Sequence, residues 1–145
     1  MSDVSITLVG GDEVLKKFRA LYDRAKNKEY AMKLVANAMQ RDVKQHFEDE
    51  KSPTGKWKDL KPATWAWKTK HNKSWILRNS GDLWKGNLPE HDNETAKVVN
   101  RMEYAQPQNY GDSKRNLPAR EFLWLSKAAM TNIIKLITAY IKGGM

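Results

Sequence analysis

The chain has 145 residues, of which 40% are apolar, 10% aromatic and 30% charged. This length predicts one domain, residues 1–145, and the composition is too apolar and aromatic for a disordered chain. The absence of Cys excludes disulfides and Cys-based zinc or iron–sulfur sites. The net charge of +9 favours a nucleic acid or an acidic protein as the partner and does not choose between them.

No targeting or membrane segment is expected. The first residues lack a basic stretch followed by an apolar run, so they do not resemble a signal peptide. The longest apolar-rich stretch, residues 123–141, is interrupted by Ser, Lys, Thr and Asn, which argues against a transmembrane helix. We therefore expect a small soluble domain made in the cytoplasm.

The N-terminal third predicts one strand and two helices. Val4, Ile6 and Leu8 alternate with polar residues, which indicates a short half-buried strand. Asp12 is placed to cap a helix whose apolar residues recur every three or four positions from 14 to 25. A second amphipathic helix is expected over 28–47. Asn27 is a plausible break between the two, and the alternative is one bent helix.

Residues 51–75, called the arm below, have a different composition. The arm carries seven Lys against a single acidic residue, Asp59, and four of the six Trp of the chain. Pro53, Gly55 and Pro62 interrupt it, and neither a helical nor a strand period is sustained. We predict a long, irregular, projecting loop, which in a compact domain is uncommon unless it is functional.

The C-terminal half predicts further elements. Ser80–Leu83 indicates the capped start of a short helix, and 95–101 indicates a strand, whereas 104–110 stays ambiguous and 111–116 indicates a polar loop. Pro118 suits the first turn of the last helix, expected over about 126–142. Its polar stripe is narrow, which fits either a helix central to its own domain or one that also meets another subunit; the stripe is Thr131, Lys135, Thr138 and Lys142.

No enzyme signature is present, so we expect no catalytic residue, cofactor or metal. His46, His71 and His91 lack the spacing of metal ligands, and Gly55-Lys56 lacks the upstream glycine of a phosphate-binding loop. His46 is expected to lie among solvated charges near a helix end. A hydrolase would need paired carboxylates or a metal cluster, and neither stands out.

The arm has two interpretations. Lys and exposed Trp together suit non-specific nucleic-acid binding, in which Lys meets phosphate and indoles stack on bases. The candidate DNA-facing residues are Lys56, Lys58, Lys61, Lys68 and Lys70. Alternatively, the Trp side chains anchor the arm to its own domain or to a neighbouring subunit, since Trp is enriched at interfaces. Specific nucleic-acid readers more often use Arg, which the arm lacks, so we favour the second interpretation.

Four motifs in fixed order carry a resemblance to a known family. They are Gly55-x-Trp57-x-x-Leu60 with Thr64 and Lys68; Ile76-Leu77-x-x-Ser80-Gly81-x-Leu83; Tyr104-Ala105-x-x-Gln108-x-x-Gly111; and Leu117-Pro118-Ala119-Arg120-x-Phe122-Leu123. Together they resemble the virion morphogenesis, or tail completion, proteins of Mu-like and related contractile-tailed phages and prophages. The family often has His and Phe where this chain has Pro107 and Tyr110.

The resemblance implies an α+β fold, with N-terminal and C-terminal helices packed on a small, largely antiparallel sheet and a long projecting loop. It implies a non-enzymatic virion protein of the tail or neck, made in the host bacterial cytoplasm. Such a protein forms a ring, for which a hexamer is one candidate, at the head-proximal end of the tail and enables head–tail joining. Its expected partners are itself, the tail tube, terminator or head-connector proteins, and packaged DNA through non-specific contact. The resemblance does not distinguish a tail-completion role from a tail-terminator role. It also does not distinguish a phage, a prophage and a tail-like bacteriocin as the source.

The resemblance also suggests residue roles. Trp57, Leu60, Leu77 and Leu83 are expected to fasten the arm to the body, and Tyr104 and Gln108 to hydrogen-bond a loop at a packed junction. Arg120 is expected to pair with a carboxylate within the subunit or across an interface. Gly55, Gly81 and Gly111 are expected in turns that larger residues resist. Trp65 and Trp67 complete the candidate interface.

Overall fold

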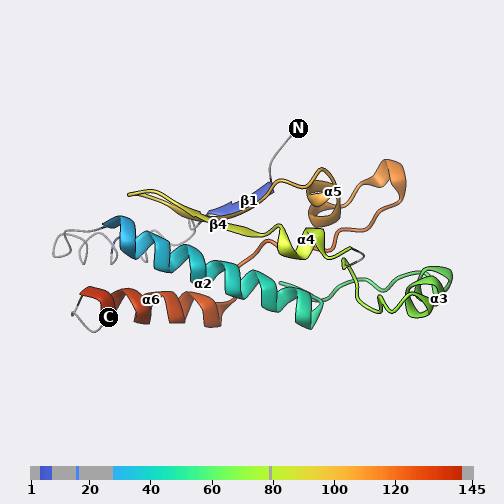
Figure 1. Cartoon of the computed structure of the whole chain (residues 1–145), viewed down its shortest axis with the longest axis horizontal. Helices are drawn as coiled ribbons and strands as arrows, with labels where there is room; N and C mark the ends of the chain where they lie inside the picture. Colours follow the sequence, from blue (N-terminus) through green and yellow to red (C-terminus); the bar gives the residue numbers. More distant parts are fainter. Residues whose placement is uncertain (1–3, 8–15, 17–27, 79, 142–145) are drawn as a thin grey trace.

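Three layers make up the body of the molecule: a small antiparallel sheet, helix α2 (Lys28–Asp49) and helix α6 (Lys127–Ile141). In this computed structural model, which describes residues 4–7, 16, 28–78 and 80–141, α2 packs on the sheet and α6 lies along the other side of α2 (Figure 1). The fold is α+β, as predicted. The helix expected over residues 14–25 lies outside the described residues, apart from Lys16, which is helical.

The sheet has the strand order β1-β5-β4, with both pairs antiparallel. Strand β5 (Ala96–Asn100) lies between β1 (Val4–Thr7) and β4 (Leu88–His91), and its register places Val4 opposite Asn100 and Leu88 opposite Val99. The strands predicted near 4–8 and 95–101 are confirmed over these bounds. Strand β4 was not predicted, because Leu88-Pro89-Glu90-His91 does not alternate and contains a proline. An edge strand tolerates that proline, since one side of its backbone needs no ladder partner.

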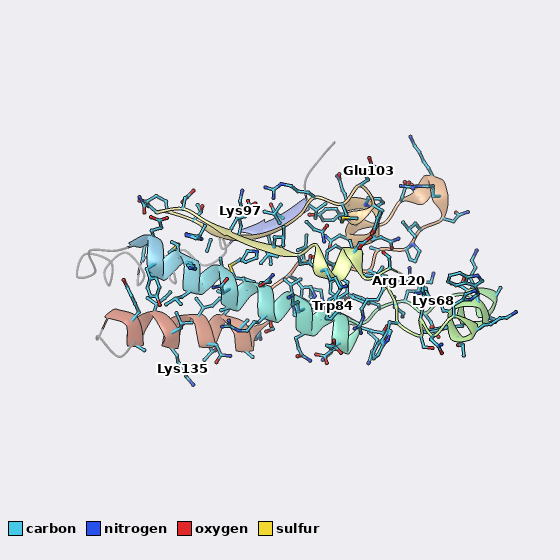
Figure 2. The ribbon with its side chains drawn as sticks, viewed as in Figure 1. Lys68, Trp84, Lys97, Glu103, Arg120 and Lys135 are labelled. Atoms are coloured by element: carbon cyan, nitrogen blue, oxygen red, sulfur yellow. The ribbon has the colours of Figure 1, made fainter. Side chains whose placement is uncertain are left out.

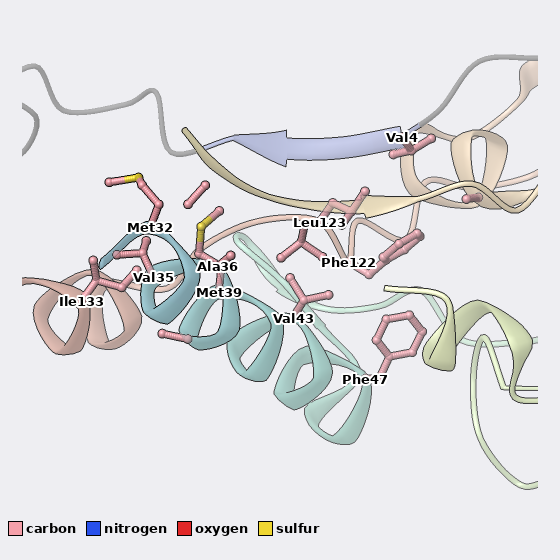
Figure 3. Packing of buried hydrophobic residues seen from close by; sticks show 14 of the residues in the cluster. Val4, Met32, Val35, Ala36, Met39, Val43, Phe47, Phe122, Leu123 and Ile133 are labelled. Atoms are coloured by element: carbon pink, nitrogen blue, oxygen red, sulfur yellow. The ribbon is translucent and has the colours of Figure 1, made fainter. Parts of the chain in front are cut away.

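The core follows one face of α2. Val35, Met39, Val43 and Phe47 recur every four residues, and each is fully buried (Figure 3). Such a stripe is what an amphipathic helix presents to its core, and each side chain stabilises the fold by about 1.5–3 kcal/mol. The predicted helix over 28–47 is therefore confirmed, and it extends two residues further.

The predicted helix over 126–142 is confirmed as α6, but its start differs from the expectation for Pro118. Ser126 precedes the helix, and its Oγ accepts the Ala129 N–H at 3.0 Å. Pro118 instead lies in an extended segment whose Leu117 pairs with Asp112. Because this segment crosses the body before the helix begins, Pro118 is not in its first turn. On α6, Ala129, Ile133 and Ile137 are buried against α2, whereas Ile134 is 38% exposed, so α6 is an outer layer rather than a helix central to its own domain.

Glycine is required at the turns beside two short helices, α4 (Asp82–Lys85) and α5 (Ala105–Tyr110). Gly81 precedes α4 with a φ of 86°, and Gly111 follows α5 with a φ of 81°. A Cβ on Gly111 would lie 2.9 Å from the Ala119 nitrogen, so a larger residue meets both strain and a clash. Gly55 also has a positive φ, so the expectation for all three glycines is confirmed.

Candidate functional site

The prediction of an irregular loop over the arm is wrong, because the arm contains regular secondary structure. It begins with a hairpin of β2 (Lys51–Ser52) and β3 (Gly55–Lys56) and continues into α3 (Pro62–Lys70). Pro62 occupies the start of the helix, where its missing N–H is not needed. The helix has no apolar stripe because Lys68 is its only buried residue, so the helical period left no signal in the sequence.

The four Trp of the arm divide into anchors and exposed side chains. Trp57 is buried, its Nε1 donates to the Glu121 carbonyl at 2.9 Å, and its ring meets Phe47 edge-on. Trp65 is half-buried and donates to the Asp59 carboxylate. Trp67 and Trp75 are 47% and 46% exposed. Two indoles thus fasten the arm to itself and to the body, and two remain at the surface.

The expected DNA-facing lysines also divide. Lys58, Lys61 and Lys70 are exposed, and Lys56 is exposed but donates to the Asp49 carbonyl. Lys68 is only 8% exposed, and its Nζ donates to the Trp75 carbonyl, so it does not face outward as expected. Burial lowers the pKa of Lys68, and the nearby Glu50 charge opposes this shift. Lys68 points inward because its ammonium group donates a hydrogen bond to the Trp75 carbonyl, which lies in the segment after α3.

Arg120 connects the root of the arm to the body, but not through a carboxylate. It is 6% exposed; its Nε donates to the Lys58 carbonyl at 2.8 Å and its Nη2 to the Asp59 carbonyl at 3.1 Å. The expected ion pair within the subunit is therefore replaced by hydrogen bonds to two consecutive main-chain carbonyls. Burial lowers the pKa of Arg120, while the Asp59 charge acts in the opposite direction.

Tyr104 and Gln108 do not make the expected side-chain hydrogen bonds within the described part of the chain. Tyr104 is 39% exposed and precedes α5. The Oε1 of Gln108 is buried without a partner, although the Gln108 main-chain carbonyl accepts the Arg120 N–H at 2.9 Å. Both residues instead border a hollow between the arm and the body.

This hollow, called the cleft below, has a volume of about 480 Å³. It gathers Leu60, Leu83, Tyr104, Gln108 and Arg120 from the predicted set, whereas Trp57, Trp65 and Trp67 lie outside its lining. Figure 2 places Lys68 and Arg120 close to one another where the chain leaves the body toward α3. The remaining lining residues are Lys68, Leu77, Arg78, Ser80, Gly81, Asp82 and Met102.

Arg78 is a site residue that the sequence analysis missed. Its Nη2 donates to the Phe47 carbonyl at 3.2 Å, its Nη1 pairs with Glu48 at 3.3 Å, and its guanidinium lies 4.0 Å from the Trp75 ring centroid. It occupies an unspecified position of the second motif, so no pattern singled it out. The preceding Leu77 has a φ of 62°, which costs a non-glycine residue about 1–2 kcal/mol. Such strain concentrates at functional sites.

His46 is buried rather than solvated, which corrects the sequence expectation. Its Nε2 lies 3.0 Å from the Trp124 carbonyl and 3.2 Å from the Asp42 carboxylate, and its ring stacks on Trp124 at 3.7 Å. The Ser126 Oγ donates to Asp42 at 2.7 Å and does not bond the imidazole. The cluster therefore lacks the nucleophile–base hydrogen bond of a hydrolase triad. It holds the start of α6 against α2.

The Asp42 cluster makes stability depend on pH. Burial raises the pKa of Asp42, but hydrogen bonds from His46 and Ser126 outweigh burial and hold it below its usual value. A carboxyl with a lower pKa in the folded state stabilises the fold above its unfolded pKa of about 3.9, and the contribution disappears as pH falls through the folded pKa. We expect Asp42→Asn to lower stability by about 1 kcal/mol at pH 7 and to cost progressively less below about pH 4.

Urea unfolding of the wild type and of Asp42→Asn, repeated at pH values from neutral to about pH 3, measures how the difference between their free energies of unfolding decreases. Asp49→Asn, which changes an exposed carboxylate on the same helix, serves as the control. A difference between wild type and Asp42→Asn that stays constant over that range would contradict the assignment.

Within the described residues no group of three His, Asp or Glu side chains is placed to hold a metal ion. The helices described there are also too short or too polar to cross a membrane. What the described chain presents is an α+β body, a fastened arm with exposed indoles and a cleft bordered by cations.

The chain belongs to the phage virion morphogenesis family, whose model matches residues 9–142. The match confirms the resemblance seen in the four motifs and gives the protein a role in building phage particles. No curated protein and no solved structure matches the chain.

Proposed function

We propose that this chain is a tail-completion or neck component that forms a homo-oligomeric ring at the head-proximal end of the tail and enables head–tail joining. Membership of the virion morphogenesis family supports a structural role in the virion. The observation that carries the ring is the pair of exposed indoles, Trp67 and Trp75, on an arm that is itself fixed to the body. Exposed Trp on a rigid support is typical of a subunit interface.

The shape of the chain suits a head-to-tail contact. Helix α3 lies at one end of the elongated molecule, and the beginning of α2 and the end of α6 lie at the other (Figure 1). A ring needs heterologous contacts, in which one patch meets a different patch on the next copy. We assign one of these two patches to α3. The neighbouring tail tube, terminator or head-connector proteins would then contact the faces of the assembled ring.

The paired substitutions Trp67→Ala and Trp65→Ala test this assignment. Trp67 is exposed, so its removal should leave the midpoint of thermal unfolding within about 2 °C and abolish the oligomer. Trp65 hydrogen-bonds Asp59 inside the arm, so its removal should weaken the arm itself. Native mass spectrometry of nuclease-treated protein at low and high salt reports assembly. A complementation assay for tail assembly is added because a ring that forms only on a tail would not be detected in the purified protein.

If Trp67→Ala assembles like the wild type in both assays, the arm is not the subunit contact. If the wild-type chain neither forms a ring nor restores tails in the complementation assay, the tail-completion role is wrong.

The second candidate function is non-specific nucleic-acid binding by residues 51–75. Lys58, Lys61 and Lys70 are exposed on the same arm as the exposed Trp67, which favours it. Phosphate contacts release counterions, so this binding should weaken steeply with added salt, whereas an indole-based subunit contact should not. A monomer that binds single-stranded DNA only at low salt, and loses binding in Lys61→Gln, would favour this function over the ring.

A further inference from the structure

The arm contacts the body as a unit with its own small sheet. Strands β2 and β3 pair with one another and with no strand of the β1-β5-β4 sheet. Side chains of the body hold the arm instead, since Arg120 donates to the carbonyls of Lys58 and Asp59. In the same way the Trp124 Nε1 donates to the carbonyl of Lys51 at 3.2 Å. The arm is therefore docked on the body and is not an extension of its sheet.

The surface that receives the arm fits one indole closely. Trp57 is 5% exposed, and its ring meets the ring of Phe47 edge-on with the centroids 5.5 Å apart. Its Nε1 donates to the carbonyl of Glu121. The arm-binding surface, as we call it below, consists of Phe47, Arg120, Glu121 and Trp124. The described chain thus shows which occupant this surface fits, namely an arm.

The outer part of the arm is held together by contacts within the arm. Trp65 donates to the Asp59 carboxylate, and Lys68 donates to the Trp75 carbonyl. Helix α3 lies at the end of the elongated molecule, beyond the sheet and the two long helices (Figure 1). These contacts are independent of the body on which the arm is docked.

Both connections between the arm and the body pass through a residue with an unfavourable backbone conformation. Glu50 precedes the arm with a φ of 51°, and Leu77 follows it, after Ile76, with a φ of 62°. Among the described residues only two other non-glycine residues have a positive φ, and both are Asn, which tolerates this region better. The Glu50 Oε2 accepts the Ile76 N–H at 2.6 Å, so the two connections lie side by side. Short connections under strain favour exchange of an element between copies, because the strain is relieved when the connections extend.

We propose that copies of this chain exchange their arms, so that the arm of one copy occupies the arm-binding surface of the next. The same hydrogen bonds and ring contacts form in the exchanged state, and only the connections at Glu50 and Leu77 change, so exchange costs little free energy. Each copy then gives an arm and receives another at a different surface, which is the heterologous contact that a ring requires. Exchange between copies stands by itself, whereas closure into a ring on the tail rests on the proposed function.

Cross-linking between two different copies tests the exchange. The sequence contains no Cys, so Lys58→Cys in one full-length chain and Glu121→Cys in another introduce the only thiols. Residues 58 and 121 lie close together, because the Lys58 carbonyl accepts from Arg120, the neighbour of residue 121.

One of the two chains carries a mass tag, and the pair is unfolded together in urea, refolded and treated with a short bismaleimide. Exchange is expected to give a product that contains both chains. The control pair combines Lys58→Cys with Lys114→Cys, whose second thiol lies on an exposed turn outside the arm-binding surface. The mixed product should exceed that of the control pair by about tenfold, because docking raises the effective concentration of the two thiols.

Two variants of Leu77 separate backbone strain from loss of the side chain. Leu77→Gly and Leu77→Ala both remove the leucine side chain, but only glycine adopts a φ of 62° without strain. Leu77→Gly is expected to give about fivefold less mixed product than Leu77→Ala, because its closed form is no longer strained. Asn72→Gly, at a positive-φ position in the turn after α3, is the control and should leave the yield unchanged.

Mixed product no more abundant than in the control pair, both after refolding and in tails built from the two chains, overturns the exchange. Equal yields from Leu77→Gly and Leu77→Ala overturn the role of strain. Restored tails in which a chain carrying both thiols is cross-linked only to itself refute the exchange and leave the proposed function standing. Mixed product from chains that restore no tails refutes the proposed function and leaves the exchange standing.

Discussion

Replacing Asn109 with Ala is expected to destabilise the protein by about 3 kcal/mol, because two buried main-chain donors lose their shared acceptor. The Oδ1 of Asn109 accepts the Phe122 N–H at 2.9 Å and the Leu123 N–H at 3.0 Å. Asn109 is 2% exposed, and Phe122 and Leu123 belong to the core, so water cannot replace the lost oxygen without opening the structure. This one amide joins α5 to the segment that carries Arg120 into the cleft.

Urea unfolding followed by circular dichroism measures the Asn109→Ala effect. Asn132→Ala, on the exposed face of α6, is the control and should change stability by less than about 0.5 kcal/mol. A loss below about 1 kcal/mol for Asn109→Ala would mean that the two N–H groups find other acceptors.

Replacing Arg120 with Lys is expected to destabilise the protein by about 2 kcal/mol and to expose the arm to proteolysis. The guanidinium bridges the carbonyls of Lys58 and Asp59 with two nitrogens of one planar group. A lysine ammonium is a compact point charge without this fork and cannot hold both carbonyls in the same geometry. The root of the arm would then separate from the body more often.

Two measurements distinguish this local opening from general unfolding. Limited trypsin digestion should cut Arg120→Lys between residues 51 and 75 several-fold faster than the wild type, while urea unfolding reports global stability. Arg115→Lys, whose exposed partner is Asp112, should behave like the wild type in both assays. Unchanged cleavage within the arm would show that the Arg120 guanidinium does not hold the arm in place.

The elements that the sequence predicted are those with a buried face. Helices α2 and α6 repeat apolar residues at the helical period because each packs one stripe on the core, and β5 presents Ala96 and Val98 to it. The elements missed lack such a face. Strand β4 contains Pro89 at a sheet edge, and α3 buries only the charged Lys68, so neither leaves a periodic apolar pattern.

The site was predictable as a set of motifs but not as an arrangement. Leu60, Leu83, Tyr104, Gln108 and Arg120 come from four motifs spread over the chain and meet at one cleft. The sequence could not show that Lys68 and His46 are buried, because Lys and His are usually exposed or intermediate and only the surrounding carbonyls reveal the exception. Arg78 carried no motif signal, and its role follows from contacts with Phe47, Glu48 and Trp75.

The strand order sets the sequence of folding events. Strand β4 is joined to β5 by a short turn, so this hairpin closes a small loop, whereas β1 must wait for β5, which lies some ninety residues later in the chain. During synthesis the first strand therefore leaves the ribosome long before its partner exists. The arm, whose hydrogen bonds link Trp65 to Asp59 and Lys68 to Trp75, closes only short loops. We expect its helix to form early and the addition of β1 to complete the body last.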